Sequence, residues 1–161
     1  MASDDFVVTP WNVEGDIDYD KLIKRFGTQK ITPELLSKIE KFTNESHFML
    51  RRGIFFSHRD LNRLLDDYEK GKKFFLYTGR GPSGHTHIGH LVPWVFAKWL
   101  QDKFQTKMYF QLTDDEKFWS KKDMTLEKTS EFALENALDF IALGFKPENT
   151  KIIIDTKNIK T

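Results

Sequence analysis

A cluster of histidines in the middle of the chain has the residue types and spacing to bind an anion. His85, His87 and His90 are three of the five histidines of this 161-residue chain, and they fall within six positions directly before a predicted helix. A helix N-terminus offers free N–H groups and a positive dipole to a phosphate. His87 and His90 can aim N–H donors at one ligand, and Gly89 between them lets a flat base approach the backbone. The pattern predicts a phosphate-binding loop.

The residues of this loop exclude two known nucleotide-binding motifs and leave one other interpretation open. The loop is not a P-loop, because G-x-x-x-x-G-K-[ST] is absent, and it lacks the third glycine of G-x-G-x-x-G. The three histidines could instead bind a transition metal, with Asp114, Asp115 or Glu116 as carboxylate partners. That metal site would suit a metal-dependent hydrolase. On residue types alone, the phosphate site and the metal site both stay open.

Composition excludes several classes of protein. The chain carries 25 basic and 24 acidic residues, a formal net charge of +1, which argues against a histone-like nucleic-acid binder. The absence of cysteine excludes disulfide scaffolds, cysteine zinc sites, iron–sulfur clusters and cysteine nucleophiles. The chain has no apolar run long enough for a membrane span, and its first residues lack the pattern of a signal peptide. We therefore expect a cytoplasmic protein without membrane contact.

The first part of the chain, residues 1–71, is expected to be a mostly helical extension. A short helix over Tyr19–Phe26 ends at Gly27, and Thr32 is the expected N-cap of a second helix that starts at Pro33. Ser57 is the expected N-cap of a third helix that ends before Gly71. The segment between the last two helices, His47–Phe56, is expected to be a loop or a broken turn.

Residues 72–161 show the pattern of an α/β unit. Three short apolar runs predict buried strands, at Phe74–Thr78, Met108–Leu112 and Lys151–Ile154. Between them lie an apolar helix from about His90 to Lys103 and a longer helix with Thr125 as N-cap and Gly144 at its end. Strands that alternate with helices predict a parallel, right-handed βαβαβ half-sheet.

Polar side chains are expected where the predicted strands end, which is where such sheets bind ligands. Tyr77 and Gln111 lie at the carboxyl ends of two neighbouring predicted strands, and Glu116 follows the second. Each residue taken alone is more typical of a core or loop-edge position. Together they predict a ligand site at this edge.

Four motifs in the same order resemble the eukaryotic cytoplasmic tryptophanyl-tRNA synthetases, which are class I aminoacyl-tRNA synthetases. Pro82 followed by His87-Ile88-Gly89-His90 resembles the H-I-G-H signature of that class. The other three motifs are Val8–Gly15, Phe75–Ser83 and Thr113-Asp114-Asp115-Glu116-Lys117. The resemblance implies the first half of a Rossmann-type parallel sheet behind a helical N-terminal extension. It identifies the chain as an N-terminal portion, without the K-M-S-K-S-type loop and the anticodon-binding domain.

The resemblance also implies a reaction and its partners. The parent protein would be a tryptophan–tRNA ligase, which activates L-tryptophan with ATP and Mg²⁺ to tryptophanyl-adenylate and transfers it to tRNA(Trp). It would be a cytoplasmic homodimer. The 161-residue fragment itself is expected to be inactive or weakly active. A tyrosyl-type synthetase and a non-catalytic binding fragment are the alternatives.

The resemblance assigns a role to nine residues. His87 and His90 would be the catalytic pair that holds the ATP phosphates, and Gly89 would make room for adenine. Arg80 and Lys117 would also contact ATP. Tyr77 and Gln111 would bind the indole N–H, and Glu116 would face the α-ammonium group of tryptophan. Trp11 would belong to a lid, and no residue is expected to hold a metal ion directly.

Overall fold

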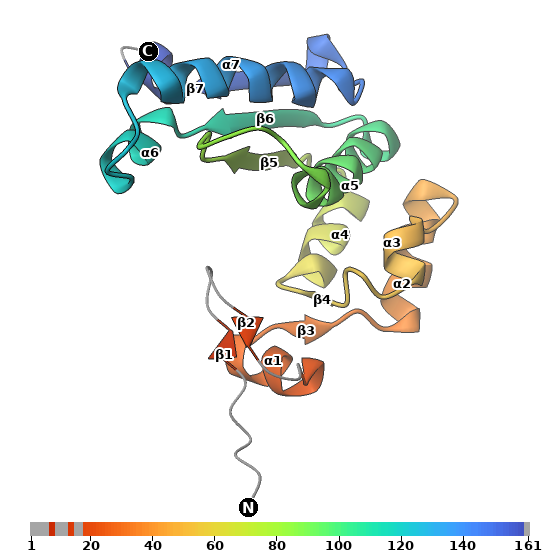
Figure 1. Cartoon of the computed structure of the whole chain (residues 1–161). Helices are drawn as coiled ribbons and strands as arrows, with labels where there is room; N and C mark the ends of the chain where they lie inside the picture. The colour runs from red at the N-terminus through yellow and green to blue at the C-terminus, as the bar shows by residue number, and fades with distance from the viewer. Residues whose placement is uncertain (1–6, 9–12, 15–17, 160–161) are drawn as a thin grey trace, which may run out of the picture.

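A three-stranded parallel sheet organises the second half of the molecule. The computed structural model describes residues 7–8, 13–14 and 18–159 (Figure 1). The strands lie in the order β5 (Phe75–Arg80), β6 (Lys107–Leu112) and β7 (Thr150–Ile154). Helices α5 (Ile88–Phe104) and α7 (Leu126–Ala142) connect them, and both strand pairs are parallel. The predicted βαβαβ unit and α/β fold class are confirmed.

One face of this sheet carries the larger hydrophobic core. Because side chains alternate along a strand, Met108, Phe110 and Leu112 of β6 all point to the same face. They pack with Trp94 of α5 and Phe140 of α7. The rings of Phe110 and Phe140 are stacked with their centroids 3.8 Å apart. Both connecting helices therefore cover the same face of the sheet.

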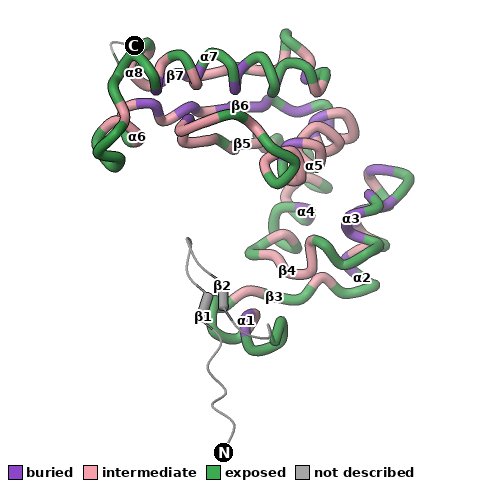
Figure 2. The backbone as a smooth tube through the Cα atoms, in the orientation of Figure 1, coloured by how far each residue is buried: buried purple, intermediate pink, exposed green. Residues whose placement is uncertain are grey.

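The opposite face of the sheet is open to solvent in the described part of the chain. Phe75 and Tyr77 on β5 are 63% and 62% exposed. Figure 2 shows the contrast between β6, which is largely buried, and the more accessible β5. Strand register places Tyr77 beside Tyr109 and Gly79 beside Gln111 on this open face. Parallel sheets normally have both faces covered, so this face is accessible to a ligand or to further protein.

The N-terminal part is mostly helical, as expected. Its elements are β1 (Val7–Val8), β2 (Val13–Glu14), α1 (Tyr19–Phe26), β3 (Gln29–Lys30), α2 (Pro33–Thr43), α3 (Phe48–Arg51), β4 (Ser57–His58) and α4 (Leu61–Glu69). The pairs β1–β2 and β3–β4 are antiparallel. A second hydrophobic cluster joins Leu35, Ile39 and Leu65 of these helices to Phe104 of α5. This cluster holds the helical extension against the sheet unit.

Local sequence signals place several helix ends where they were predicted. Gly27 ends α1 with φ of 61°, a left-handed conformation that suits glycine. Thr32 caps α2 by accepting a hydrogen bond from the Leu35 N–H at 3.3 Å. Thr125 caps α7 by accepting one from the Lys128 N–H at 3.2 Å. Each interaction spans at most a few residues, which is why the sequence alone predicts it.

The predicted N-cap at Ser57 is wrong. Ser57 lies in β4, where it pairs with Lys30 of β3, and α4 begins only at Leu61. His58 takes over part of the capping, since its Nδ1 accepts a hydrogen bond from the Leu61 N–H at 3.2 Å. The long-range pairing of two extended segments overrides the local preference of serine for a helix start.

Six short elements were not predicted. Four are helical: α3, within the expected loop or broken turn at His47–Phe56, and α6 (Asp114–Ser120), η1 (Pro147–Asn149) and α8 (Asp155–Asn158). The other two are the paired strands β3 and β4. Strand β5 also runs past Gly79 to Arg80. A Cβ at position 79 would collide with the main-chain carbonyl of Gln111, so glycine permits the close approach that lengthens the strand. In the described residues, no helix is long and apolar enough to cross a membrane.

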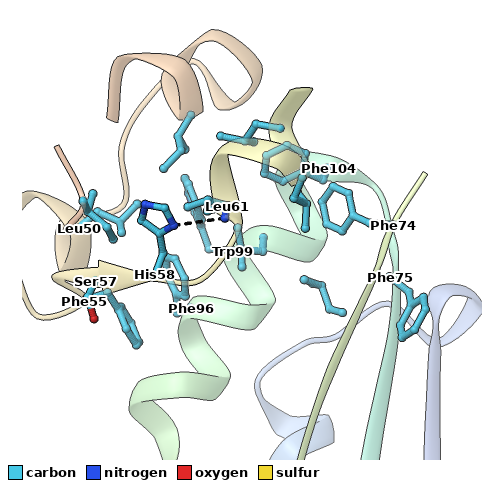
Figure 3. Close-up of a pocket in the computed structure, with 16 residues that line it drawn as sticks. Leu50, Phe55, Ser57, His58, Leu61, Phe74, Phe75, Phe96, Trp99 and Phe104 are labelled. Atoms are coloured by element: carbon cyan, nitrogen blue, oxygen red, sulfur yellow. Dashed lines mark hydrogen bonds between the residues drawn. The ribbon is translucent and has the colours of Figure 1, made fainter. Parts of the chain in front are cut away.

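An apolar cavity of about 220 Å³ lies between the helical extension and α5 (Figure 3). Aromatic side chains such as Phe55, Phe96 and Trp99 line it, and the His58–Leu61 hydrogen bond lies at its edge. Among the described residues, none with a predicted site role lines this cavity. The candidate functional site lies elsewhere, at the carboxyl ends of the strands.

Candidate functional site

His87 and His90 cap helix α5 reciprocally. His87 is the N-cap, and its Nδ1 accepts a hydrogen bond from the Gly89 N–H at 3.2 Å. The His87 N–H in turn donates to Nδ1 of His90, also at 3.2 Å. The two rings lie with their centroids 3.7 Å apart. The helix start thus uses two histidines in place of the usual serine or threonine with glutamate.

This capping fixes the tautomer of both histidines. A neutral imidazole whose Nδ1 accepts a hydrogen bond carries its proton on Nε2. Burial, with the charge of Arg80 and the neighbouring His87, lowers the pKa of His90 below its usual value. The pair therefore presents two N–H donors at the start of a helix. That arrangement suits the phosphate site that the sequence predicted.

The free energy of unfolding is expected to fall as the pH is lowered from 7.5 to 5.5. Burial lowers the pKa of His47, His58 and His90. The unfolded chain therefore takes up protons first as the pH drops through about 6.5, and proton uptake favours the unfolded state. Urea unfolding at pH 7.5, 6.5 and 5.5 measures this. His90→Gln keeps an acceptor for the capping bond and should weaken the pH dependence. Stability that stays constant or rises over this range would contradict the expectation.

Arg80 shapes the glycine-rich loop that precedes the histidines. Its guanidinium donates to the carbonyls of Gly84 and His85 at 3.0 and 2.9 Å and to the Thr86 hydroxyl at 3.4 Å. Its Nε is buried without a hydrogen-bond partner. Burial lowers the pKa of Arg80, an effect that Asp139 opposes. Its predicted contact with a nucleotide phosphate stays a prediction.

Asn136 on α7 supports the same loop, and the sequence analysis did not identify it. It is fully buried, and its Nδ2 donates to the Gly84 carbonyl at 3.2 Å. An asparagine among the apolar residues of α7 was the available signal. His85, by contrast, turns away from the other two histidines and contacts Glu135 at 3.1 Å. The loop is therefore fixed from two sides, by Arg80 and by Asn136.

Tyr77 and Gln111 form a hydrogen-bonded pair on the open face of the sheet, and their contact with an indole N–H stays a prediction. The Tyr77 hydroxyl bonds to Oε1 of Gln111 across Gly79. The Nε2 group of Gln111 donates to both carboxylate oxygens of Asp155, at 2.8 and 2.9 Å. Asp155 was not predicted as a site residue. Its position directly after the third strand was the signal, because all three strands end at the same edge.

Glu116 and Lys117 lie next to the glycine-rich loop. Glu116 accepts hydrogen bonds from Lys117 Nζ at 2.9 Å and from the Thr113 hydroxyl at 3.0 Å. Lys117 and then Thr113 lower the pKa of Glu116, against the effect of burial, so the side chain is an anion at neutral pH. A Cβ at Gly81 would collide with the Lys117 side chain. The motif after β6 therefore touches the loop after β5.

Asp114, named above as a possible carboxylate partner of a metal site, has a structural role. It is fully buried. Its carboxylate accepts hydrogen bonds from the Thr156 N–H at 3.1 Å, the Thr156 hydroxyl at 2.5 Å and the Ser130 hydroxyl at 3.4 Å. It therefore ties α6 to α7 and α8.

The structure brings the predicted residues together in three groups. These are His87 with His90 and Gly89, Tyr77 with Gln111, and Glu116 with Lys117; no hydrogen bond or ion pair joins one group to another within the described ranges. Trp11, the predicted lid residue, lies outside the described residues. Across residues 18–159, no three histidine, aspartate or glutamate side chains gather where they could hold a metal ion.

Comparisons with known proteins show the family of this chain. Residues 69–161 match the family model described as tRNA synthetases class I (W and Y). The tryptophan–tRNA ligase of Saccharolobus solfataricus is 55% identical over 157 residues, which cover 98% of this chain and 41% of that protein. The relative from Sulfurisphaera tokodaii, of the same name, is 58% identical over 157 residues, which cover 97% of this chain and 41% of that protein.

Solved structures show the same relationship. The tryptophanyl-tRNA synthetase of Plasmodium falciparum is 47% identical with a TM-score of 0.86, over 89% of this chain and 40% of that one. The Encephalitozoon cuniculi enzyme bound to tryptophan is 44% identical with a TM-score of 0.84, over 89% and 40%. The chain thus spans about two fifths of the length of these relatives. With the family model matching more than half of its length, the chain belongs to the tRNA synthetases class I (W and Y).

Proposed function

We propose that this chain is the part of a tryptophan–tRNA ligase that binds L-tryptophan and the phosphates of ATP. The hydrogen-bonded pair of Tyr77 and Gln111 carries the proposal. A hydroxyl and an amide oxygen placed together on an open sheet face can accept the N–H of an indole ring. The phenol of tyrosine also has a donor, its O–H, but carries it at a different position on the ring. Glu116, an anion at neutral pH, suits the α-ammonium group.

The histidine pair supports the nucleotide half of the proposal. Two Nε2–H donors at the N-terminus of α5 would hold the ATP phosphates, since donors aimed at developing charge stabilise phosphoryl and nucleotidyl transfer. Gly89 keeps the helix start free of a side chain. Arg80 and Lys117 would add positive charge on the loop side. Mg²⁺ would enter with ATP, because oxygen ligands from phosphates and water suit it and no built cage is required.

The activity of the whole protein and its partners belong to the same proposal. It includes transfer to tRNA(Trp), assembly as a homodimer and a cytoplasmic location, and the similarity to tryptophan–tRNA ligases supports the first of these. The predicted eukaryotic cytoplasmic type is best proposed in a broader form, as a type common to archaeal and eukaryotic relatives. Identities of 55% to a Saccharolobus protein and 47% to a Plasmodium protein support this breadth. The division at residues 71 and 72 into an extension and a catalytic half-domain is part of the proposal.

L-tryptophan is expected to raise the melting temperature of this chain, and L-tyrosine is not. A ligand that binds only the folded state stabilises it by mass action, by about 2.7 kcal/mol at a hundred times its dissociation constant. Differential scanning fluorimetry over a concentration series measures the shift, and ATP with Mg²⁺ is titrated in parallel.

The shifts in melting temperature also distinguish between the alternative functions of the chain. A larger shift with L-tyrosine would favour a tyrosyl-type synthetase. A stably folded chain that responds to neither amino acid nor ATP would favour a non-catalytic binding fragment. Loss of stability on adding a chelator would favour a metal-dependent protein.

A further inference from the structure

The side-chain amide of Gln111 has one defined orientation. Its Nε2 group faces Asp155, with distances of 2.8 and 2.9 Å to the two carboxylate oxygens, and its Oε1 faces the Tyr77 hydroxyl. A glutamine amide can otherwise turn by half a rotation and exchange the positions of its donor and its acceptor. The orientation of the amide decides whether a ligand on the open sheet face meets the acceptor Oε1 or the donor Nε2.

Asp155 is the group that decides this orientation. An ionised carboxylate accepts hydrogen bonds and donates none, so it tolerates only the amide nitrogen beside it. The hydroxyl of Tyr77 cannot make the choice, because a hydroxyl both donates and accepts. The hydrogen bonds to Asp155 therefore set the orientation of the amide, in which Oε1 faces Tyr77.

The setting of Asp155 fits a functional role better than a stabilising one. Burial and the nearby carboxylates of Asp115 and Asp114 raise the pKa of Asp155 above its usual value. A raised pKa in the folded state means that folding disfavours the charged form. The chain thus keeps a carboxylate where it is unfavourable for stability, directly behind the amide that faces the ligand.

We propose that Asp155 is a positioning residue for tryptophan specificity: by holding Nε2 of Gln111 it presents Oε1 as an acceptor to the indole N–H. This inference rests on the proposed function and adds to it a residue outside the predicted site. A site whose amide could turn would offer an N–H to the ligand's N–H in one of its two orientations. It would therefore discriminate less well between tryptophan and an analogue that has no N–H.

Asp155→Asn tests the proposal with little change of shape. Asparagine offers one acceptor and one donor, so it accommodates either orientation of the Gln111 amide. Isothermal titration compares binding of L-tryptophan with that of its benzothiophene analogue, in which sulfur replaces the indole N–H. We expect the preference of the chain for tryptophan to fall about tenfold in this variant, the scale of one hydrogen bond. Asp155→Glu keeps a carboxylate and is expected to restore part of the preference.

A control variant and a second measurement separate positioning from charge and folding. Asp123→Asn removes an exposed negative charge that bonds to neither Gln111 nor Asp155, and it should leave the preference intact. In amide NMR spectra, hydrogen exchange of the Gln111 side-chain NH₂ should be slow in the wild-type chain and faster in Asp155→Asn. Circular dichroism melting shows whether each variant folds.

The outcomes distinguish this inference from the proposed function. A wild-type chain that prefers tryptophan, with the same preference in Asp155→Asn, would overturn the role of Asp155 alone. Loss of folding in both Asp155 variants would assign the residue a structural role and overturn the inference. A wild-type chain that binds neither tryptophan nor the analogue would overturn the proposed function, and the specificity role of Asp155 with it.

Discussion

Replacing Asp114 with alanine is expected to lower the free energy of unfolding by about 3 kcal/mol, because buried partners would be left unpaired. The variant loses three hydrogen bonds at once, from the Thr156 N–H and from the hydroxyls of Thr156 and Ser130. These groups lie where α6, α7 and α8 meet, and Asp114 itself is fully buried. Removing one partner from a buried network costs more than the network contributes as a whole.

Urea denaturation of purified protein measures this loss directly. Asp123→Ala is a matched control, since Asp123 is an exposed aspartate that follows α6 and its replacement should change stability by less than about 0.5 kcal/mol. Equal stability of the two variants would show that Asp114 does not hold α6 in place. Because Glu116 and Lys117 lie on α6, loss of that anchor should also disturb the predicted ammonium-binding group.

Replacing Gln111 with leucine is expected to remove the preference for tryptophan over its benzothiophene analogue. Leucine has a similar volume but no acceptor for the indole N–H, and it leaves the Tyr77 hydroxyl and the Asp155 carboxylate without their shared partner. Sites that bind a polar group of a substrate through buried partners can reject analogues without it by as much as about 10⁴-fold. Because Tyr77 is largely exposed in this chain, we expect a smaller preference for tryptophan in the wild-type chain, of about 10- to 100-fold, and its loss in Gln111→Leu.

Titration calorimetry with both ligands measures this preference, with Gln105→Leu as the control. Gln105 lies at the end of α5, where its Nε2 bonds to the carbonyl of Asp102, remote from the site motifs. The preference should survive in that variant. Combining Gln111→Leu with Asp155→Asn gives a further check. If Asp155 acts through Gln111, its replacement should have no further effect on the preference once the amide is gone. Additive losses would mean that Asp155 contacts the ligand by another route.

The carboxylate of Asp155 and the amide of Gln111 show how specificity can come from residues far apart in the sequence. The two lie 44 positions apart and meet because β6 and β7 pair in a fixed parallel register, with Gln111 beside Ile153. Burial of alternate residues of β6 sets that register, since a shift by one residue would turn its apolar side chains to the open face. The core on one face thus determines which polar groups meet on the other.

Several elements of the fold were predictable because their signals act over a few residues. Thr32, Thr125 and Gly27 placed helix ends correctly, and the apolar runs predicted all three parallel strands. The predicted N-cap at Ser57 was wrong, because β3–β4 pairing, which joins residues 27 and 29 positions apart, competed with the local capping preference. The short helix α6 was missed, because its acidic first turn reads equally well as a solvated loop.

The sequence by itself determined the residue types of the site and the edge of the sheet at which they lie. The histidine pair, Tyr77, Gln111 and Glu116 all follow or end predicted strands, and parallel strands bring their ends to one edge. The orientation of the two histidines comes from capping bonds at the start of α5, which span only two and three positions. Only the tertiary structure decided the orientation of the Gln111 amide, because its partner Asp155 lies 44 positions away. Residue type fixes which donors and acceptors exist, but the direction of this amide depends on a hydrogen-bond partner that only the packed fold brings within reach.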